Sequence, residues 1–352
     1  MGRFAFQLLR LKISQEVPRS FASHRGLARA RFALIAVIPA FALVLLAAWF
    51  AVETIRPEIT DPEYHMRLRL IRAAQTEHPA KPLGIVIGSS RTVWAFRPEQ
   101  LPPESGVYWV NGSHVGAGPT LTRLMLHRFL RDGIQPAVAV IEVLPTSFVK
   151  ENQQFTTGHF ATAEVPMMCR YADQPLEYEA YFLRHRLARI PALSHVSNPF
   201  FGYPLLLSRG GRAQLEIEMS PEERARHLAL CRKMNADYLS RLAVRPAADR
   251  AFRDTIREAQ DNGIRVVLLR SPEGPTFRSW YNPEGLAQFD RYIAGIAAEY
   301  GVPVVDARLW LDEDDFFDSH HVLKRGADKF TTRFGRELST VLTGCADSGG
   351  KP

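Results

Sequence analysis

The sequence predicts an α/β protein, a three-layer α/β/α sandwich with a mainly parallel five-stranded sheet. Short apolar runs without polar alternation recur along the chain, as in parallel strands that are covered on both faces. Helical patterns lie between these runs, which favours right-handed crossovers that place helices on the sheet. Hydrophobic residues make up 46% of the 352 residues, enough for a sizeable core. An amino-terminal transmembrane helix and a mostly helical insertion complete the predicted architecture.

The first element is a predicted membrane anchor at residues 32–52. The segment FALIAVIPAFALVLLAAWFAV contains no charged residue and is long enough to cross a hydrocarbon core about 30 Å thick. Pro39 is tolerated in a membrane helix, and Trp49 lies near one end, where interfacial aromatic residues gather. A cleaved signal peptide is the alternative, but its apolar region usually spans only about 7–15 residues. We therefore expect an uncleaved anchor.

The charge of residues 1–31 sets the expected orientation. This tail holds seven arginines and lysines against Glu16 alone, so the positive-inside rule keeps it in the cytoplasm. Everything after residue 52 is then extracytoplasmic, and the chain is a single-pass protein of the inner (cytoplasmic) membrane with a periplasmic domain. The tail carries most of the net charge of +7, so the basic isoelectric point reflects topology and predicts no nucleic-acid partner.

The remaining elements alternate between residues 82 and 342, which we expect to form one exported domain. Residues 53–81 form a partly helical juxtamembrane stalk before it, and residues 343–352 a disordered tail after it. The expected strands are Gly84–Gly88, Val107–Asn111, Ala137–Val143, Arg265–Arg270 and Val302–Asp306. The expected helices are Thr120–Asp132, Ala247–Asp261, Pro283–Tyr300 and Gly326–Leu342.

The alternation breaks over about residues 150–245, the predicted insertion. One of its helical segments begins with Ser220, Pro221 and Glu223, which is the pattern of a capping box. We interpret the insertion as a cap over the carboxyl edge of the sheet, where α/β sheets bind ligands. A packing or partner surface is the alternative.

The three cysteines, Cys169, Cys231 and Cys345, have no CxxC or Cys/His metal spacing. In an oxidising compartment Cys169 and Cys231 could form a disulfide, and two buried thiols are the equal alternative.

The first segment with a candidate catalytic residue is KPLGIVIGSSRTV, in which an apolar strand ends at a glycine and two serines. Ser90 is either part of an ordinary strand-to-helix turn or a nucleophile at the carboxyl end of a parallel strand. Nucleophilic acyl chemistry needs a hydroxyl, a base, a carboxylate that orients the base, and donors for the oxyanion.

The segment FFDSHHVLKRGADKF supplies a base and a carboxylate three residues apart. In a turn, Asp318 and His321 can reach one point, with the carboxylate fixing the imidazole tautomer. His320 is the rival base. A metal half-site is another interpretation of this spacing, but no further His/Asp cluster stands out in the sequence to complete it, and we expect no metal.

The segment VNGSHVGAGPT again follows a strand, and Gly116 permits the close backbone approach that an oxyanion donor needs. A flexible glycine-rich turn is the plain alternative. His114 in this segment is better explained as a structural histidine than as a catalytic one.

Together the three segments resemble the SGNH (GDSL-like) hydrolase superfamily, over about residues 82–342. Its first block is Gly-Asp-Ser or a variant, and its last block is Asp-x-x-His. The resemblance implies that Ser90 is the nucleophile, with Ser89 in place of the usual aspartate, and that His321 and Asp318 are its partners. It also implies that Gly116, in a second block that begins at residue 111, is the oxyanion glycine, and that the backbone N–H of Ser90 is a further oxyanion donor. The resemblance implies that neither metal nor cofactor is required.

The third block departs from the family pattern. Where Gly-x-Asn-Asp is usual, the chain has VIEVLPTSF, which puts Thr146 at the position of the oxyanion asparagine. Loss of one oxyanion donor costs about 10²–10³ in rate. Either the oxyanion hole is built differently, or turnover is slow, or a sugar hydroxyl accepts the acyl group instead of water.

With its Gly-Ser-Ser block and membrane anchor, the chain is similar to the branch that contains teichoic-acid D-alanyl transfer and alginate O-acetylation proteins. This implies an O-acyltransferase or esterase that uses an acyl-serine intermediate on envelope or exopolysaccharide acyl groups. Its partners would be an acylated polysaccharide or a lipid-linked acyl donor, and a multi-spanning acyltransferase. Two alternatives remain: a decayed polysaccharide-binding or scaffold subunit, and a lipase-like esterase whose apolar groove comes from NPFFGYPLLL (198–207).

Three more polar residues are expected near the mouth of the site. Arg91 follows the nucleophile and either binds an anionic substrate or caps the sheet edge. Arg270 and Tyr281 follow the fourth strand and are expected to contact substrate.

Overall fold

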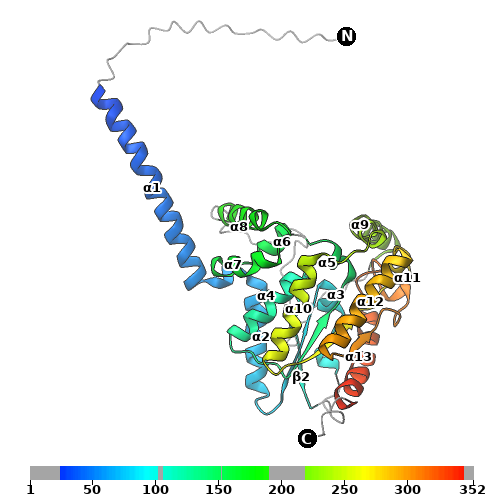
Figure 1. Ribbon diagram of the computed structural model, residues 1–352. Helices are drawn as coiled ribbons and strands as arrows, with labels where there is room; N and C mark the ends of the chain where they lie inside the picture. Colours follow the sequence, from blue (N-terminus) through cyan, green and yellow to red (C-terminus); the bar gives the residue numbers. More distant parts are fainter. Residues whose placement is uncertain (1–23, 102–105, 152, 190–218, 345–352) are drawn as a thin grey trace, which may run out of the picture. The chain divides into compact units, whose positions relative to one another are not determined.

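The computed structural model describes residues 24–101, 106–151, 153–189 and 219–344, and it divides into two units, Met1–Thr54 and Ile55–Pro352. In its described part the first unit is the helix α1 (His24–Ile55), with Pro39 inside it (Figure 1). Its segment Arg31–Ile55 is long and apolar enough to cross a membrane, by length and composition. The predicted groove segment at residues 198–207, most of the basic tail and Cys345 lie outside the described residues.

The second unit is built on a five-stranded sheet in the order β2-β1-β3-β4-β5, and each neighbouring pair is parallel. The strands are β1 (Leu83–Ile87), β2 (Tyr108–Asn111), β3 (Val138–Glu142), β4 (Arg265–Arg270) and β5 (Val304–Asp306). All five were predicted, and the fold class is confirmed. β5 begins two residues later than expected because Pro303 has no N–H to add to the ladder.

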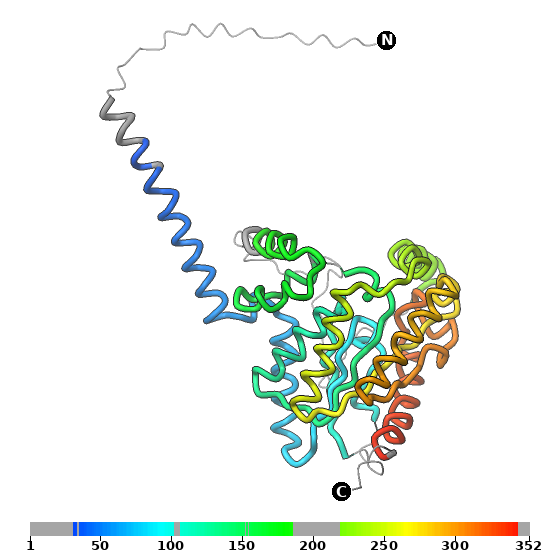
Figure 2. Tube along the Cα trace, in the orientation of Figure 1, coloured from blue at the N-terminus to red at the C-terminus, as the bar shows by residue number. Residues whose placement is uncertain are grey.

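Helices cover both faces of this sheet (Figures 1 and 2). A row on one face comprises α4 (Pro119–Arg131), α10 (Pro246–Asp261) and α12 (Pro283–Tyr300), and the opposite face carries α3 (Ser90–Ala95) and α13 (Lys324–Gly344). Each helix of the row begins with a proline, whose fixed φ and missing N–H suit the first helical position. α12 stops at Gly301, which adopts φ 61°.

The core is formed by side chains that point alternately to the two faces of the sheet along each strand. Val86, Val140 and Val267 point to the same face and belong to one buried cluster with Phe330 and Phe334 of α13. Intervening strand residues such as Ile141 are equally buried on the other face. Both sheet faces are therefore apolar, as the uninterrupted hydrophobic runs predicted.

The insertion is mostly helical in its described part. It contains α6 (Gln153–Thr157), α7 (Val165–Met168), α8 (Pro175–Arg189), α9 (Pro221–Ser240) and the 3₁₀ turns η4 (Thr162–Glu164) and η5 (Cys169–Tyr171). The predicted capping box is present: Glu223 N–H donates to Ser220 Oγ at 3.2 Å and Ser220 N–H donates to Glu223 Oε2 at 2.9 Å. Cys169 and Cys231 are free thiols, and only Cys231 is fully buried.

The predicted stalk is helical over α2 (Pro62–Glu77), after the 3₁₀ turn η1 (Pro57–Ile59). Arg67, fully buried, donates to the carbonyl of Asn111 at 3.0 Å, and the Tyr64 hydroxyl donates to Asp132 at 2.5 Å. These contacts join α2 to β2 and to the end of α4. The remaining short elements are α5 (Pro145–Val149), α11 (Pro275–Arg278), η2 (Pro98–Gln100) and η6 (Glu313–Asp315).

Candidate active site

The turn after β1 presents Ser90 at the carboxyl edge of the sheet. Gly88 is required there because a Cβ would lie 2.5 Å from Glu142 Cβ and 2.6 Å from Thr92 Oγ1. Ser89 is the N-cap of α3, since its hydroxyl accepts from Arg91 N–H at 3.2 Å. Ser90 is therefore the first residue of α3, partly exposed, and its N–H has no intrahelical acceptor.

A buried carboxylate ties this turn to the neighbouring strands. Glu142, at the end of β3, accepts from Ser89 N–H and from the Ser271 hydroxyl, each at 2.5 Å. It thus joins the loops that follow β1, β3 and β4. Glu142 was not among the predicted site residues, because a single glutamate at a strand end carries no local signature of this role.

The three residues predicted to cooperate are hydrogen-bonded in series. Ser90 Oγ lies 2.8 Å from His321 Nε2, across 231 positions of sequence. His321 Nδ1 lies 2.8 Å from Asp318 Oδ2. Because the ionised carboxylate accepts the Nδ1 proton, Nε2 is left to accept the proton of the serine hydroxyl. The spatial convergence that the sequence argument assumed is thus present in the structure.

Aromatic rings hold the imidazole of His321 in place. Phe317 stacks on it with 5.4 Å between ring centroids, and Trp94 meets it edge-on at 4.6 Å. The rival base, His320, is buried and stacks on Phe277 at 4.8 Å. Of the two adjacent histidines, His321 is the one hydrogen-bonded to Ser90.

Asp318 is fixed as an anion by the turn it begins. Its Oδ1 accepts from the backbone N–H of His320 at 2.9 Å and of His321 at 2.6 Å. Burial alone would raise the pKa of Asp318, but the charge of His321 and the hydrogen bonds from both histidines hold that pKa below its usual value. Ser319 closes the turn in the left-handed region, at φ 62°.

The three predicted oxyanion donors, Ser90, Gly116 and Thr146, lie on the turns after β1, β2 and β3. The loop after β2 is tied to the turn after β1 because His114 N–H donates to the Gly88 carbonyl at 2.8 Å. Gly116, at φ 72°, packs under Phe155, whose ring would lie 2.7 Å from a Cβ there. Thr146 is buried in the first turn of α5. The donor roles of Gly116 and Thr146 stay predictions.

The three residues predicted to bind substrate are engaged elsewhere. Arg91 is 2% exposed, donates to the carbonyls of Ser271 and Pro272, and pairs with Glu273 at 3.4 Å. The buried Arg270 pairs with Asp290 and Asp306, and the Tyr281 hydroxyl donates to Glu273 at 2.7 Å. These contacts favour the structural alternative for Arg91, and contact with substrate stays a prediction for all three residues.

Part of the insertion lies against the Asp318–His321 turn. Arg224 of α9 donates to the carbonyl of Phe316 at 2.8 Å, and the ring of His227 meets Phe317 edge-on at 5.8 Å. A cavity of about 270 Å³ lies between α9 and this turn and is lined in part by Asp318. α9 therefore lies beside this turn, and the role of the insertion as a cap stays a prediction.

Comparisons with known proteins add little to this geometry. A protein-family model that names no activity matches residues 220–343, less than half of the chain. No curated protein matches the sequence. A crystal structure from Bacteroides fragilis, provisionally named an acylhydrolase, is 13% identical, with 77% of this chain and 97% of that chain covered and a TM-score of 0.35. A GDSL-like lipase from Bacteroides thetaiotaomicron is 12% identical, with 83% and 100% covered and a TM-score of 0.38. Such low scores decide nothing about activity.

Proposed function

We propose that the protein is a membrane-anchored, extracytoplasmic serine esterase or O-acyltransferase. One observation carries this proposal: the hydrogen-bonded series from Ser90 Oγ through His321 to Asp318, at 2.8 Å for each step. A hydroxyl, an imidazole and a buried carboxylate in this order form the machinery of nucleophilic acyl transfer.

In the proposed reaction Ser90 Oγ attacks the carbonyl carbon of an O-acyl ester while His321 Nε2 takes the hydroxyl proton. The tetrahedral intermediate collapses, the ester C–O bond breaks, and His321 returns the proton to the leaving alcohol. The resulting acyl-Ser90 is then attacked by a sugar hydroxyl or by water, with His321 again acting as base. The bond between Ser90 Oγ and the acyl carbon breaks, and His321 returns the proton to Ser90 Oγ. Asp318 stabilises the imidazolium in both steps.

The N–H groups of Ser90 and Gly116 are the proposed oxyanion donors. The first is free of intrahelical bonding, and the left-handed backbone at Gly116 allows the chain to pass closely. The Thr146 hydroxyl would add one donor in place of an amide. A hole weaker than usual slows acylation and deacylation alike, and the choice between a sugar hydroxyl and water then depends on which acceptor the site positions.

We further propose that the substrate is an acyl group of an envelope polysaccharide or exopolysaccharide, or of a lipid-linked acyl donor. The apolar length of α1 supports a single-pass anchor that keeps the site near such donors. A multi-spanning acyltransferase that delivers the acyl group is the proposed protein partner.

Labelling with a fluorophosphonate probe tests the nucleophile. The full chain in detergent is expected to form a covalent adduct, and Ser90→Ala is expected to form none. Ser279→Ala is the matched control, because this exposed serine only bonds to the nearby Thr276 carbonyl, and it should label like the wild type.

The outcome also separates the alternatives. Absence of labelling in the wild-type chain would contradict the proposal and favour a scaffold or polysaccharide-binding subunit. If the chain labels, a comparison of short with long acyl esters separates a polysaccharide esterase from a lipase-like enzyme.

A further inference from the structure

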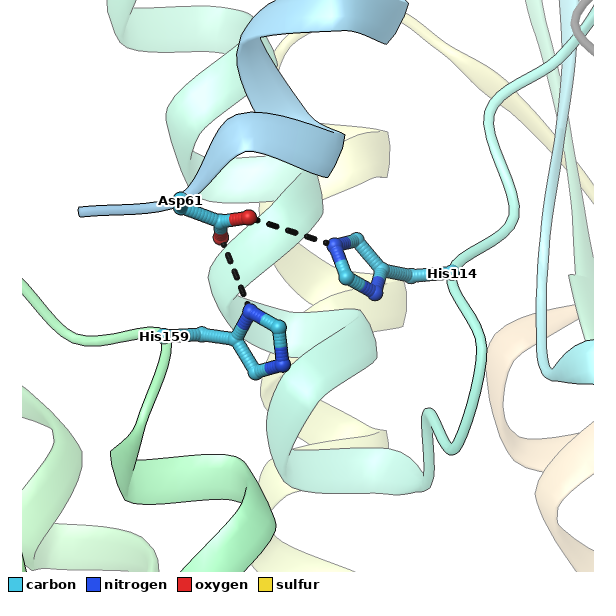
Figure 3. A group of neighbouring side chains, drawn as sticks. All are labelled: Asp61, His114 and His159. Atoms are coloured by element: carbon cyan, nitrogen blue, oxygen red, sulfur yellow. Dashed lines mark ion pairs between the residues drawn. The ribbon is translucent and has the colours of Figure 1, made fainter. Parts of the chain in front are cut away.

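A second cluster of chemically active side chains lies in the second unit, outside the candidate active site. It joins Asp61, which caps α2, with His114 from the loop after β2 and His159 from the loop after α6. Figure 3 shows that each oxygen of the Asp61 carboxylate faces a different imidazole ring. The sequence gives no hint of this cluster, because its members are spread over almost 100 positions.

Neither histidine forms a hydrogen bond with Asp61, although both face it. His114 Nε2 lies 3.4 Å from Oδ1 and His159 Nδ1 lies 3.2 Å from Oδ2. Both nitrogens are buried and have no hydrogen-bond partner among the described residues. His114 was expected to be a structural histidine, and its Nε2 lacks a hydrogen bond of good geometry. Two unpaired nitrogens aimed at one carboxylate are what a shared cation would resolve.

A second carboxylate lies behind the other ring nitrogen of His114. His114 Nδ1 lies 3.2 Å from Glu63 Oε2, which can only accept a proton from it. When the ring carries its proton on Nδ1 alone, Nε2 presents a lone pair toward Asp61, which is the form that binds a metal. A carboxylate behind the second nitrogen of a histidine is the usual support of a metal ligand.

Arginine side chains hold the carboxylates around this cluster. Arg67 pairs with Glu63, and Glu164 is shared by Arg128 and Arg131. Arg128 also donates to Asp61 Oδ2 at 2.8 Å and so orients that carboxylate from behind.

The geometry points to a divalent metal site formed by Asp61, His114 and His159, of the kind that takes Zn²⁺. Two ligands of a tetrahedral zinc ion lie about 3.3–3.5 Å apart when each is about 2.0–2.2 Å from the metal. The two Asp61–histidine separations are close to this, and all three ligand atoms lie within 4.8 Å of one another. The His159 side chain is 15% exposed, so it is the ligand nearest the surface, and the fourth ligand of a tetrahedral ion would be water.

A bound ion would brace the loop that carries Gly116. His114 precedes this glycine by two residues, and the ring of His159 contacts Phe155 at 4.8 Å. Phe155 in turn covers Gly116. The ion would therefore fix the start of α2 and both loops together, as structural zinc sites do.

Equilibrium dialysis of the full chain in detergent, stripped with a chelator and then loaded with Zn²⁺, tests this site. We expect the wild-type chain to hold one tightly bound ion. His159→Gln should weaken binding at least 10²-fold through loss of a ligand, and Glu63→Gln should weaken it by about 10–100-fold through loss of the support of His114. His127→Gln is the matched control, since His127 is a partly exposed histidine 3.0 Å from a single carboxylate, Glu258, and should leave binding unchanged.

Loading with Co²⁺ gives a second readout that does not depend on the variants. A tetrahedral site of nitrogen and oxygen ligands gives intense visible d–d bands, which His159→Gln should abolish. The proposal would be overturned if the wild type retained zinc no more strongly than His159→Gln. It would also be overturned if the wild type gave an octahedral Co²⁺ spectrum. If His159→Gln fails to fold, the wild-type Co²⁺ spectrum and the Glu63→Gln affinity decide the question.

Discussion

Asp318 is the residue on which the tautomer of the proposed base depends. Asp318→Asn would keep an oxygen for the two backbone N–H groups but remove the anion that accepts the proton of His321 Nδ1. The imidazole then loses its fixed tautomer, and we expect the rate of fluorophosphonate labelling to fall by about 10⁴-fold. Asp237→Asn, at an exposed aspartate of α9, is the control and should keep the wild-type rate. A loss of less than tenfold for Asp318→Asn would contradict the proposed mechanism.

The same carboxylate makes stability depend on pH in a defined direction. The pKa of Asp318 is lower in the folded chain than the value of about 3.9 for a free aspartate. Its ionised form therefore stabilises the fold above about pH 4, and this stabilisation is lost as the pH falls through the lowered pKa. Urea unfolding should show a wild-type advantage over Asp318→Asn that is present at about pH 5 and shrinks below pH 4. An advantage that grows below pH 4 would contradict this assignment.

Among the elements, α3 depends on one buried ion pair for its attachment to the loop after β4. Arg91→Ala would remove the guanidinium that pairs with Glu273 and donates to two carbonyls of that loop. Breaking a buried pair from one side costs about 3–5 kcal/mol, because the remaining charge is left uncompensated. Chemical denaturation measures this loss. Arg257→Ala, which breaks an exposed pair with Asp254, should cost at most about 1 kcal/mol.

Gly116, in the loop after β2, and Gly133, in the loop after α4, form a matched pair of glycines. Gly116 and Gly133 both have positive φ, but only Gly116 would bring a Cβ against the ring of Phe155. Alanine at either position should cost about 1–2 kcal/mol of stability for the left-handed backbone. Only Gly116→Ala should also shift the proposed oxyanion donor and slow probe labelling, on the order of 10²-fold for a displacement near 1 Å. Equal labelling by the two variants would argue against a role for this loop.

Local patterns predicted the elements well but not the contacts between them. The ends of α12 and β4 were predicted to the residue, because Asn282-Pro283 and Gly301 bound the helix and an uninterrupted apolar run marks the strand. The Asp-x-x-His turn was also visible, since both residues lie in one short segment. Glu142 and the Asp61 cluster were missed because each joins segments that only the fold brings together.

At the scale of the whole molecule, the sequence and the structure describe the predicted anchor helix but not the membrane around it. The length and composition of α1 are properties of the sequence alone, and the structure describes the helix without a membrane. The orientation that we expect for residues 1–31 and for the second unit rests only on the asymmetry of charge between residues 1–31 and the rest of the chain. This asymmetry is open to a direct test.

A phosphatase that is active only outside the cytoplasm, fused after Pro352, measures the orientation. We expect the fusion to be active and membrane-bound, and to retain residues 1–31, because the positively charged tail stays in the cytoplasm and the apolar segment is not cleaved. Replacing the seven basic residues of the tail by glutamine removes the charge difference and should lower the active fraction. The proposed substrates lie outside the cytoplasm, so an inactive wild-type fusion would contradict both the orientation and the substrate class. An active fusion that is released from the membrane would instead show a cleaved signal peptide and leave the chemistry of Ser90 unaffected.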